Sequence, residues 1–385
     1  MPELVAVALP GGSGFVETVQ RIWDAGDAVL PVDPAAPPAQ RALVFEIARP
    51  ARLVDASGSH RLDDALPVEA GDAVVITTSG STGTPRAAVI GHDAVEAAAY
   101  ATSTALGVSA DTRWLACLPL HHVGGFSVIT RALHTGAGLE VIERADPERI
   151  DAAAADGATH VSLVPTVLGR ISAARWRVIL LGGSAAPADR PANTVTTYGM
   201  TETFGGVVYD GLPLNGVGMR TAGEPGAPWS VPAPIELRTP SLMRCYRDGT
   251  QPASDDGWYR TGDLGTIDPT TGLLTVAGRA DDLIITGGEN IWPTPVEAAL
   301  ATHPEVAQVA VAGRPDPEWG HRVVAWVVPA DASDPPTLDE LRDHVKATLP
   351  APAAPRELVL VDSLPRTPLG KIVRHRLGGS TSDDG

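Results

Sequence analysis

The chain has 385 residues, which is enough for two or three domains with sizeable cores. Acidic residues outnumber basic ones by 46 to 29, and the net charge of −17 argues against nucleic acid or an anionic membrane as a bulk partner. An anionic ligand would therefore need local features such as backbone amides, a metal ion or single cations.

The two cysteines, Cys117 and Cys245, are isolated and fit no metal-ligand spacing, so they predict core thiols in a reducing compartment. The N-terminal segment lacks a basic stretch before a long apolar run, and we expect no secretory signal. No stretch approaches the ~18 uninterrupted apolar residues of a membrane span. These features predict a cytoplasmic protein.

Over about the first 280 residues, short β-branched runs alternate with Ala-rich helical stretches. A strand is expected over residues 73–77 and a helix over 93–105. Helical segments lie between several of the later runs, which is typical of an α/β sheet with crossover helices. The further short strands are expected over residues 114–118, 139–142, 160–164 and 177–181.

The pattern of expected secondary structure changes after Pro232. Residues 232–277 predict turn-rich strands without long helices, hence a small β subdomain. Beyond them a compact α+β domain is expected over residues 281–377, and the polar, Gly-rich residues 378–385 predict a disordered tail. The fold class is therefore predicted as α/β: a large N-terminal domain over residues 1–280, followed by the small domain. The small domain's helices are expected at 295–300 and 338–349, and its strands at 306–312, 322–328 and 357–361.

Residues 77–86, Thr-Thr-Ser-Gly-Ser-Thr-Gly-Thr-Pro-Arg, directly follow the strand at 73–77. Hydroxyls and glycines in such a loop let backbone amides and O–H groups converge on phosphate oxygens. The loop is not a Walker A motif, because no Gly-Lys-Ser/Thr follows at the required spacing. The alternative is a Ser/Thr/Gly-rich surface turn.

Three more motifs follow in order. Tyr198-Gly-Met-Thr-Glu202 supplies a carboxylate, and a carboxylate beside phosphates is a natural Mg²⁺ ligand; the alternative is a solvated loop residue. Asp263 follows Gly262 and could accept both hydroxyls of a ribose, or form an ordinary Asx turn. Arg279 and Asp281 lie at the expected boundary between the β subdomain and the small C-terminal domain, ahead of a glycine-rich stretch.

Lys371 is one of only two lysines in a chain that otherwise uses arginine. It ends the stretch Pro-Arg-Thr-Pro-Leu-Gly-Lys, where a Pro/Gly-shaped bend lets the backbone approach a ligand. A compact ammonium on a flexible stem suits a carboxylate or phosphate oxygen in a tight site. Codon usage is the alternative explanation for the scarcity of lysine.

In this order the motifs resemble the adenylate-forming acyl-CoA synthetase superfamily, and the match covers roughly residues 73–377. The resemblance implies a reaction in which ATP converts a carboxylate into an acyl-adenylate and pyrophosphate, after which the acyl group passes to a thiol, usually that of coenzyme A. Its small-molecule partners would be a carboxylic acid, ATP and coenzyme A, with Mg²⁺ as cofactor. A homodimer is left open.

The resemblance also implies residue roles. Thr201 would contact the α-phosphate, Glu202 would hold Mg²⁺, and Lys371 would bridge the attacking carboxylate and the α-phosphate. Asp263 would bind the ribose hydroxyls with Arg279 close to it. The phosphate loop ends in Arg86 where the family usually has lysine, which keeps the charge but alters its geometry. The remaining nucleotide contacts would be Thr78, Ser79, Gly80, Ser81, Thr82 and Gly83 at the phosphates, and Gly182, Gly183, Ser184 and Tyr198 around adenine and the acyl group.

In the family the small C-terminal domain swings between the two half-reactions. Asp281 falls at the hinge position, in keeping with a hinge at the end of an element. Gly287 and Gly288 belong to the loop that would face the pantetheine thiol after the swing.

Two residues bear on which carboxylic acid is the substrate. His122, in Leu-Pro-Leu-His-His-Val-Gly-Gly-Phe, matches the family position that borders the acyl pocket, or it is a capping or packing histidine. Arg131 follows at the spacing seen in the o-succinylbenzoate–CoA ligases of menaquinone synthesis. There an arginine lies near the substrate's second carboxylate; a solvated helix residue is the alternative.

The early start of the phosphate loop, near residue 78, also resembles the short actinobacterial ligases of that kind. A benzoate- or aryl-CoA ligase, and an adenylation domain that loads a carrier protein, remain open.

Overall fold

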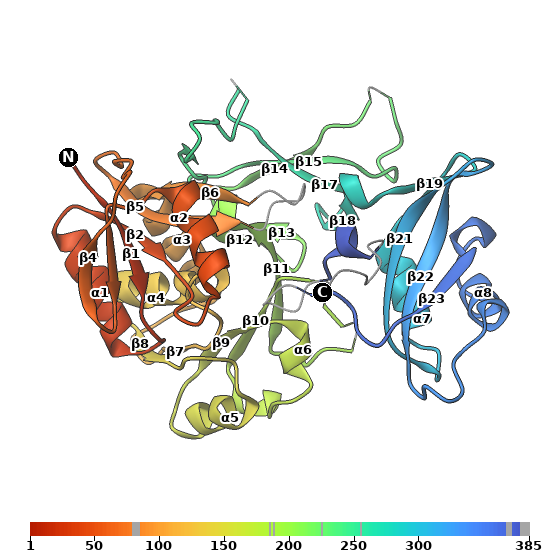
Figure 1. The fold of residues 1–385 in the computed structure, drawn as a ribbon, viewed down its shortest axis with the longest axis horizontal. Coiled ribbons are helices and arrows are strands. Elements are labelled where there is room, and N and C mark those ends of the chain that lie inside the picture. The colour runs from red at the N-terminus through yellow and green to blue at the C-terminus, as the bar shows by residue number, and fades with distance from the viewer. Residues whose placement is uncertain are drawn as a thin grey trace. The chain divides into compact units, whose positions relative to one another are not determined.

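The computed structural model describes residues 1–78, 85–184, 186–187, 189–224, 226–254, 256–366 and 372–377 (Figure 1). The chain divides into two compact units. The first consists of residues 1–220 and 236–260, and the second of residues 221–235 and 261–385. The second unit therefore begins before residue 281, and a mobile domain over 281–377 stays a prediction.

The first unit contains a seven-stranded sheet with the order β16-β6-β5-β2-β1-β3-β4. Strands β1, β2, β3 and β5 are parallel, whereas β4, β6 and β16 run antiparallel to their neighbours. The strand expected over 73–77 is confirmed as β5, whose apolar residues are buried because the strand lies inside the sheet. The bounds are β1 (Leu4–Ala8), β2 (Ala28–Pro31), β3 (Arg52–Asp55), β4 (Gly58–Arg61), β5 (Asp72–Thr78), β6 (Arg86–Gly91) and β16 (Cys245–Tyr246).

A second seven-stranded sheet of this unit has the order β13-β12-β11-β10-β9-β7-β8. Strands β7 to β11 are parallel, and β12 and β13 are antiparallel additions. The four short strands expected between residues 114 and 181 are confirmed, with shifts of one or two residues at their ends. The bounds are β7 (Arg113–Ala116), β8 (Gly138–Val141), β9 (His160–Leu163), β10 (Val178–Leu181), β11 (Thr194–Met200), β12 (Gly205–Tyr209) and β13 (Leu212–Pro213).

Helices join the two sheets through one apolar core. Phe126 of helix α4 (Val123–Thr135) makes edge-to-face contacts with Phe15, Trp23 and Phe204 at ring-centroid distances of 6.2 to 6.4 Å. The same core contains strand residues from both sheets. The helix expected over 93–105 is confirmed as α3. The other helices of the unit are α1 (Ser13–Asp24), α2 (Pro38–Ala48), α3 (His92–Ala105), α5 (Pro147–Ala155) and α6 (Pro165–Leu168).

A four-stranded sheet has the order β14-β15-β17-β18. Its strands are β14 (Gly218–Thr221), β15 (Ala233–Arg238), β17 (Tyr259–Ile267) and β18 (Leu274–Arg279). Within the second unit, β17 and β18 are antiparallel neighbours, and Asp263 lies directly opposite Arg279.

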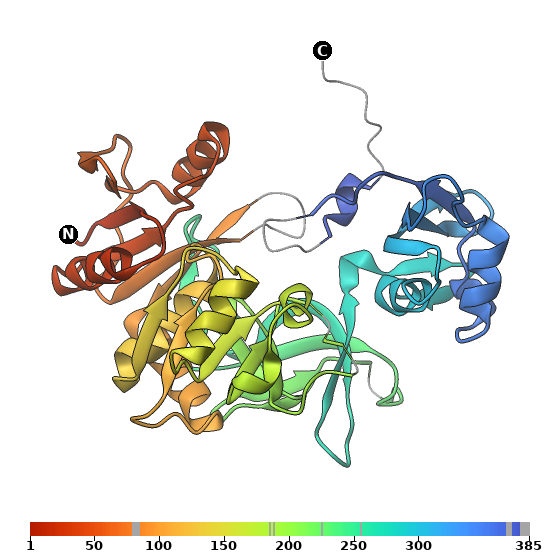
Figure 2. The same ribbon diagram turned by 90° about the horizontal axis from the view of Figure 1, so that it is seen from below.

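The C-terminal part of the second unit is an α+β fold, coloured cyan to blue in Figure 2. Its sheet has the order β20-β19-β22-β21, with β23 parallel to β22. Both helices pack their apolar residues on the same face of the sheet as Val309, Val311 and Val323. The bounds are β19 (Ile284–Thr286), β20 (Glu289–Ile291), α7 (Pro293–Leu300), β21 (Val306–Asp316), β22 (Gly320–Pro329), α8 (Leu338–Lys346) and β23 (Glu357–Leu360).

Helix α8 begins at a capping box formed by Thr337 and Glu340. The Thr337 hydroxyl accepts from the Glu340 N–H, and the Glu340 carboxylate accepts from the Thr337 N–H at 2.8 Å. None of the helices within the described ranges is long and apolar enough to cross a bilayer.

Candidate active site

The turn that carries Thr201 and Glu202 is built by the end of strand β11. A Cβ at Gly199 would collide with the Gly205 carbonyl, so only glycine lets the two segments approach. The Thr203 hydroxyl accepts from the Met200 N–H at 3.0 Å and donates to the Gly205 carbonyl at 2.8 Å. These bonds hold Thr201–Thr203 as a 3₁₀ turn at the carboxyl end of β11.

Gly182, Gly183 and Ser184 lie at the same edge of this sheet, because they follow β10 and β10 is parallel to β11. Gly183 has φ +85°, which favours glycine, and a Cβ on Gly182 would lie only 2.7 Å from the Thr197 hydroxyl oxygen. Ligands of open α/β sheets bind at the carboxyl ends of parallel strands. The two predicted segments therefore share the expected edge, next to Tyr198 near the end of β11.

Glu202 is half-buried and held in place by hydrogen bonds, so it is not a solvated loop residue. Its Oε1 accepts a hydrogen bond from the Tyr246 hydroxyl at 2.8 Å, and its backbone carbonyl accepts from the Met243 N–H at 2.7 Å. The Tyr246 ring in turn lies 3.4 Å below the guanidinium carbon of Arg86. Tyr246 could not be identified from the sequence, because no motif links it to Glu202, 44 residues earlier.

The predicted phosphate loop connects neighbouring strands. Thr78 ends β5 and Arg86 begins β6, and these two residues pair across the antiparallel register. The predicted phosphate contacts of the loop lie outside the described residues: Ser79, Gly80, Ser81, Thr82 and Gly83. Arg86 also contacts Asp248, with Nη2 and Oδ2 3.2 Å apart.

His122 lies immediately before helix α4, and its ring is 4.3 Å from that of His121, centroid to centroid. Its Nε2 is buried without a hydrogen-bond partner among the described residues. Burial, with a smaller contribution from His121, lowers the pKa of His122 to about 4. The ring is therefore neutral at physiological pH and suits the wall of a pocket better than a cation site.

We expect this histidine to make the fold acid-sensitive. The His122 pKa falls from 6.5 unfolded to about 4 folded. Above pH 6.5 the ring is neutral in both the folded and the unfolded state, so burying it does not lower the free energy of unfolding. As the pH falls from 6.5 toward 4, the unfolded state binds a proton that the folded state does not, and the free energy of unfolding decreases. Between pH 7.5 and pH 5 the loss is about 2 kcal/mol of unfolding free energy. Denaturant unfolding at both pH values should show a smaller drop for His122→Gln; equal drops would contradict the assignment.

Arg131 is buried in the fold, with 5% of its surface exposed, so the solvated-helix alternative is wrong. Its Nη2 donates to the Ser127 hydroxyl at 3.0 Å, its Nη1 approaches the Ser162 hydroxyl at 3.4 Å, and its guanidinium carbon lies 5.5 Å from the Trp114 ring centroid. Among the described residues no carboxylate pairs with it. Burial lowers the pKa of the Arg131 guanidinium, as expected for a cation without a counter-ion.

Ser127, which accepts a hydrogen bond from Arg131, lies near the residue that follows the turn at the end of β11. A Cβ built on Gly205 would lie 3.8 Å from the Ser127 hydroxyl oxygen, and Gly205 directly follows that turn. His122 precedes the same helix, and nine residues at 1.5 Å each place it about 13 Å from Arg131 along the axis. The two residues therefore lie well apart along this helix, and their roles at the acyl site stay predictions.

In the second unit, Asp263 and Arg279 form an ion pair, with Oδ1 and Nη1 3.4 Å apart. The Asp263 N–H donates to the Thr261 hydroxyl at 3.1 Å, and Arg279 Nη1 donates to the Thr261 carbonyl at 3.3 Å. Gly262 has φ +78°, and a Cβ there would lie 3.0 Å from Arg279 Nη2. Asp263 thus belongs to an organised carboxylate–guanidinium pair and not to a simple Asx turn.

Asp281 is exposed in the short 3₁₀ turn Ala280–Asp282. Gly287 and Gly288, with φ +59° and +83°, form the two-residue hairpin turn between β19 and β20. Lys371 lies outside the described residues. Arg374, three residues later, contacts Glu297 at 2.8 Å and Asp282 at 3.2 Å, which joins the segment after Lys371 to the turn that contains Asp281.

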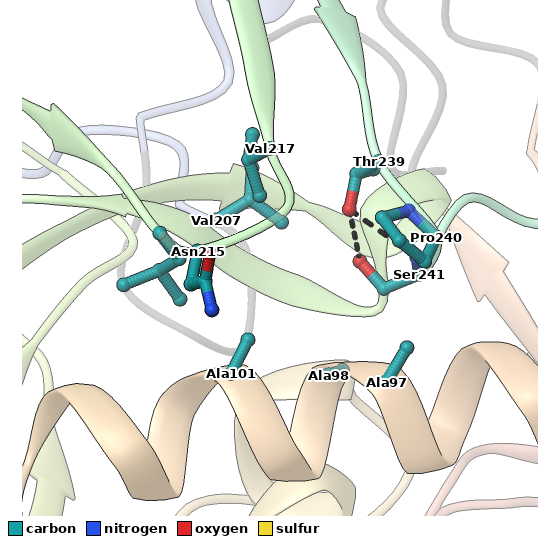
Figure 3. Close-up of a pocket in the computed structure, with 11 residues that line it drawn as sticks. Ala97, Ala98, Ala101, Val207, Asn215, Val217, Thr239, Pro240 and Ser241 are labelled. Atoms are coloured by element: carbon teal, nitrogen blue, oxygen red, sulfur yellow. Dashed lines mark hydrogen bonds between the residues drawn. The ribbon is translucent and has the colours of Figure 1, made fainter.

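A small cavity lies behind the Thr201–Thr203 turn. Figure 3 shows helix α3 on one side of it and Asn215, Thr239 and Ser241 on the other. Its volume is about 30 Å³, room for about two water molecules. Ser241 also donates to the Thr203 carbonyl at 3.0 Å. The cavity is too small for a nucleotide or an aromatic acid.

Comparison with known proteins identifies the family. Residues 59–246 match the AMP-binding enzyme family, and residues 295–371 match the AMP-binding enzyme C-terminal domain. A probable 2-succinylbenzoate–CoA ligase of Mycobacterium tuberculosis (strain H37Rv) is 36% identical over 402 residues, covering 97% of each chain. The chain belongs to the AMP-binding enzyme family.

Solved structures agree with this assignment. The o-succinylbenzoate CoA synthetase of Bacillus subtilis, in complex with the acyl-adenylate intermediate OSB-AMP, matches with a TM-score of 0.88 and 26% identity, covering 98% of this chain and 88% of that one. The same enzyme in complex with ATP and magnesium ion matches with a TM-score of 0.85 and 26% identity, covering 97% and 89%. The predicted superfamily and α/β fold class of this AMP-binding enzyme are confirmed; the roles of individual residues stay predictions.

Proposed function

We propose that this AMP-binding enzyme is an ATP-dependent acid–CoA ligase that converts o-succinylbenzoate into o-succinylbenzoyl-CoA through an acyl-adenylate, in menaquinone biosynthesis. The relative from M. tuberculosis, similar over nearly the whole chain, supports the reaction class and the acid. The observation that carries the choice of acid within this chain is the buried guanidinium of Arg131.

A buried cation without a counter-ion is costly. Arg131 has only hydroxyl and aromatic neighbours among the described residues, so none of them supplies an anion for its guanidinium. An acid with two carboxylates activates one and keeps the other as an anion. A guanidinium is well suited to bind that second carboxylate. A benzoate-type monocarboxylate would leave Arg131 unpaired.

The residues present fit a magnesium ion bound together with ATP. Glu202 offers a hard oxygen ligand, because the Tyr246 hydroxyl occupies only Oε1, and Oε2 has no partner among the described residues. Mg²⁺ typically takes one or two protein carboxylates, with substrate phosphates and waters completing its octahedron. Bound there, it would neutralise phosphate charge in the adenylation step.

In the proposed adenylation step, the carboxylate attacks the α-phosphorus and pyrophosphate leaves. Two anions must approach each other, so positive charge is needed where they meet. Lys371 would supply it, Thr201 would hold the α-phosphate, and Asp263 would hold the ribose. Gly182, Gly183, Ser184 and Tyr198 would line the adenine and acyl site, with residues 78–83 at the phosphates.

For thioester formation, the domain over residues 281–377 would turn at Asp281, withdraw Lys371 and present Gly287 and Gly288 to the pantetheine thiol. The thiolate would then attack the acyl carbonyl, and AMP would leave. A location in the reducing cytoplasm is supported by Cys117 and Cys245, which are buried free thiols; burial raises the pKa of Cys117 to about 12.

A substrate panel tests the proposal. The purified protein would be incubated with ATP, Mg²⁺, coenzyme A and o-succinylbenzoate, benzoate or another aryl acid, and AMP and acyl-CoA would be measured. We expect o-succinylbenzoate to be preferred by its kcat/KM. Preference for a benzoate would establish the aryl-CoA ligase instead. Transfer only to a phosphopantetheinylated carrier protein, with free coenzyme A ignored, would establish the carrier-loading alternative.

A further inference from the structure

Tyr246 contacts residues from three segments that are far apart in the sequence: Glu202, Arg86 and Tyr259. Its hydroxyl donates to Glu202 Oε1 at 2.8 Å, and Arg86 covers its ring at 3.4 Å. Tyr259, the first residue of β17, also hydrogen-bonds this hydroxyl. All four residues belong to the first unit.

The geometry points to Tyr246 as a positioning residue for the reaction proposed above. By holding Oε1, Tyr246 fixes the rotamer of Glu202 and directs Oε2 toward the Mg²⁺ that accompanies ATP, while Arg86 clamps the tyrosine ring. This inference rests on the proposed function, because it concerns the nucleotide step of that reaction.

The backbone makes this arrangement rigid. Strand β16 consists of Cys245 and Tyr246 alone and pairs with β6, with Tyr246 opposite Ala88. Tyr246 is buried, with 7% of its surface exposed, so its ring has little freedom to leave Glu202. Beyond it, Asp248 accepts from the Thr250 N–H at 2.8 Å in a turn and also faces Arg86 at 3.2 Å. The Tyr246 ring and Arg86 are therefore positioned by one pair of strands, β6 and β16, and Glu202 meets them from the turn after β11.

The chemistry requires the tyrosine hydroxyl to remain a donor. A carboxylate oxygen can only accept, so the phenol O–H is the donor in the bond to Glu202 Oε1. Because a phenol donates one hydrogen, it can satisfy only one carboxylate oxygen, which leaves the other for the metal.

This arrangement also accounts for Arg86, where the family usually has lysine. A guanidinium is planar and stacks on an aromatic ring, whereas an ammonium is a compact point charge. In this chain the cation at the end of the phosphate loop acts on the tyrosine and on Asp248. Its effect on the nucleotide therefore passes through Glu202.

The test begins with Tyr246→Phe, which removes one oxygen and keeps the ring. Calorimetric titration of ATP at several Mg²⁺ concentrations should show a roughly ten- to hundredfold higher Mg²⁺ requirement for ATP binding, the size expected for one lost hydrogen bond to a charged group. Mn²⁺ titration followed by electron paramagnetic resonance, with a non-hydrolysable ATP analogue, should show the same shift. ATP binding measured without metal should be unchanged.

A matched control comes from Tyr209, which is equally buried at 7% exposure and whose hydroxyl bonds to the Thr102 hydroxyl at 2.9 Å. Tyr209→Phe loses a comparable hydrogen bond and should leave the metal requirement unchanged. If both variants shift the metal requirement equally, or if Tyr246→Phe does not shift it, the positioning role is wrong.

A double substitution tests the clamp. Arg86→Ala alone should raise the Mg²⁺ requirement, but in the Tyr246→Phe background it should add little, because the hydroxyl that it orients is gone. Equal effects of Arg86→Ala in both backgrounds would show that Arg86 acts on the nucleotide directly and would overturn the clamp.

Half-reactions separate this inference from the proposed function. Tyr246→Phe should slow acyl-adenylate formation at limiting Mg²⁺ and leave thioester formation from supplied acyl-adenylate unchanged. If the unaltered protein forms no adenylate from any acid, the proposed function fails. If it does, and the variant needs no more Mg²⁺, only the role of Tyr246 fails.

Discussion

Lys371→Ala is expected to lower the rate of acyl-adenylate formation by roughly 10²–10³-fold or more, the scale of one lost transition-state charge contact. The physical reason is the repulsion between the attacking carboxylate and the α-phosphate, which a positive charge between them offsets. Thioester formation from supplied acyl-adenylate should stay mostly intact, because pyrophosphate has already left. Both half-reactions can be measured separately, the first by pyrophosphate release and the second by acyl-CoA production.

The chain offers its own control, because Lys346 is its other lysine. Lys346 ends helix α8, is largely exposed, and contacts Asp343 at 3.2 Å one turn earlier on the same helix. Lys346→Ala should change neither half-reaction. Equal loss of both half-reactions in Lys371→Ala would contradict a lysine that acts only in the first step.

Arg131→Met is expected to lower kcat/KM for o-succinylbenzoate by roughly 10²–10³-fold, the range for truncating one partner of a buried charge pair. Methionine keeps much of the length of arginine and removes its charge. For 4-oxo-4-phenylbutanoate, which lacks the ring carboxylate of o-succinylbenzoate, kcat/KM should hardly change. A steady-state comparison of the two acids measures the specificity that Arg131 supplies.

Stability distinguishes this role from a structural one. Because a buried cation without a carboxylate partner is costly, Arg131→Met should unfold at the same temperature as the unaltered protein or a higher one when no ligand is present. Arg177→Met, which removes an exposed ion pair with Asp111 at 2.8 Å, should affect neither acid. Destabilisation of Arg131→Met with equal loss of both acids would assign Arg131 to the fold.

Much of the fold was predictable because its signals are local. The apolar run 73–77 and the capping box at Thr337 report backbone conformation within a few residues, and the structure has β5 and α8 there. The pairing of Asp263 with Arg279 was also expected, from the resemblance, and it follows locally from the antiparallel register of β17 and β18. The ordered motifs were sufficient to predict the family.

The sequence by itself determined the elements, the order of the nucleotide motifs and the family. Tertiary structure decided which side chains are buried and what they face. It buried Arg131 among hydroxyl and aromatic groups without a carboxylate partner among the described residues, and it kept His122 neutral. It also brought Tyr246 to Glu202 across 44 residues. It also turned Arg86 toward Asp248, 162 residues away. Periodicity and capping reflect the backbone's short-range preferences, whereas burial, lost solvation and side-chain partners arise only when distant strands pair into sheets.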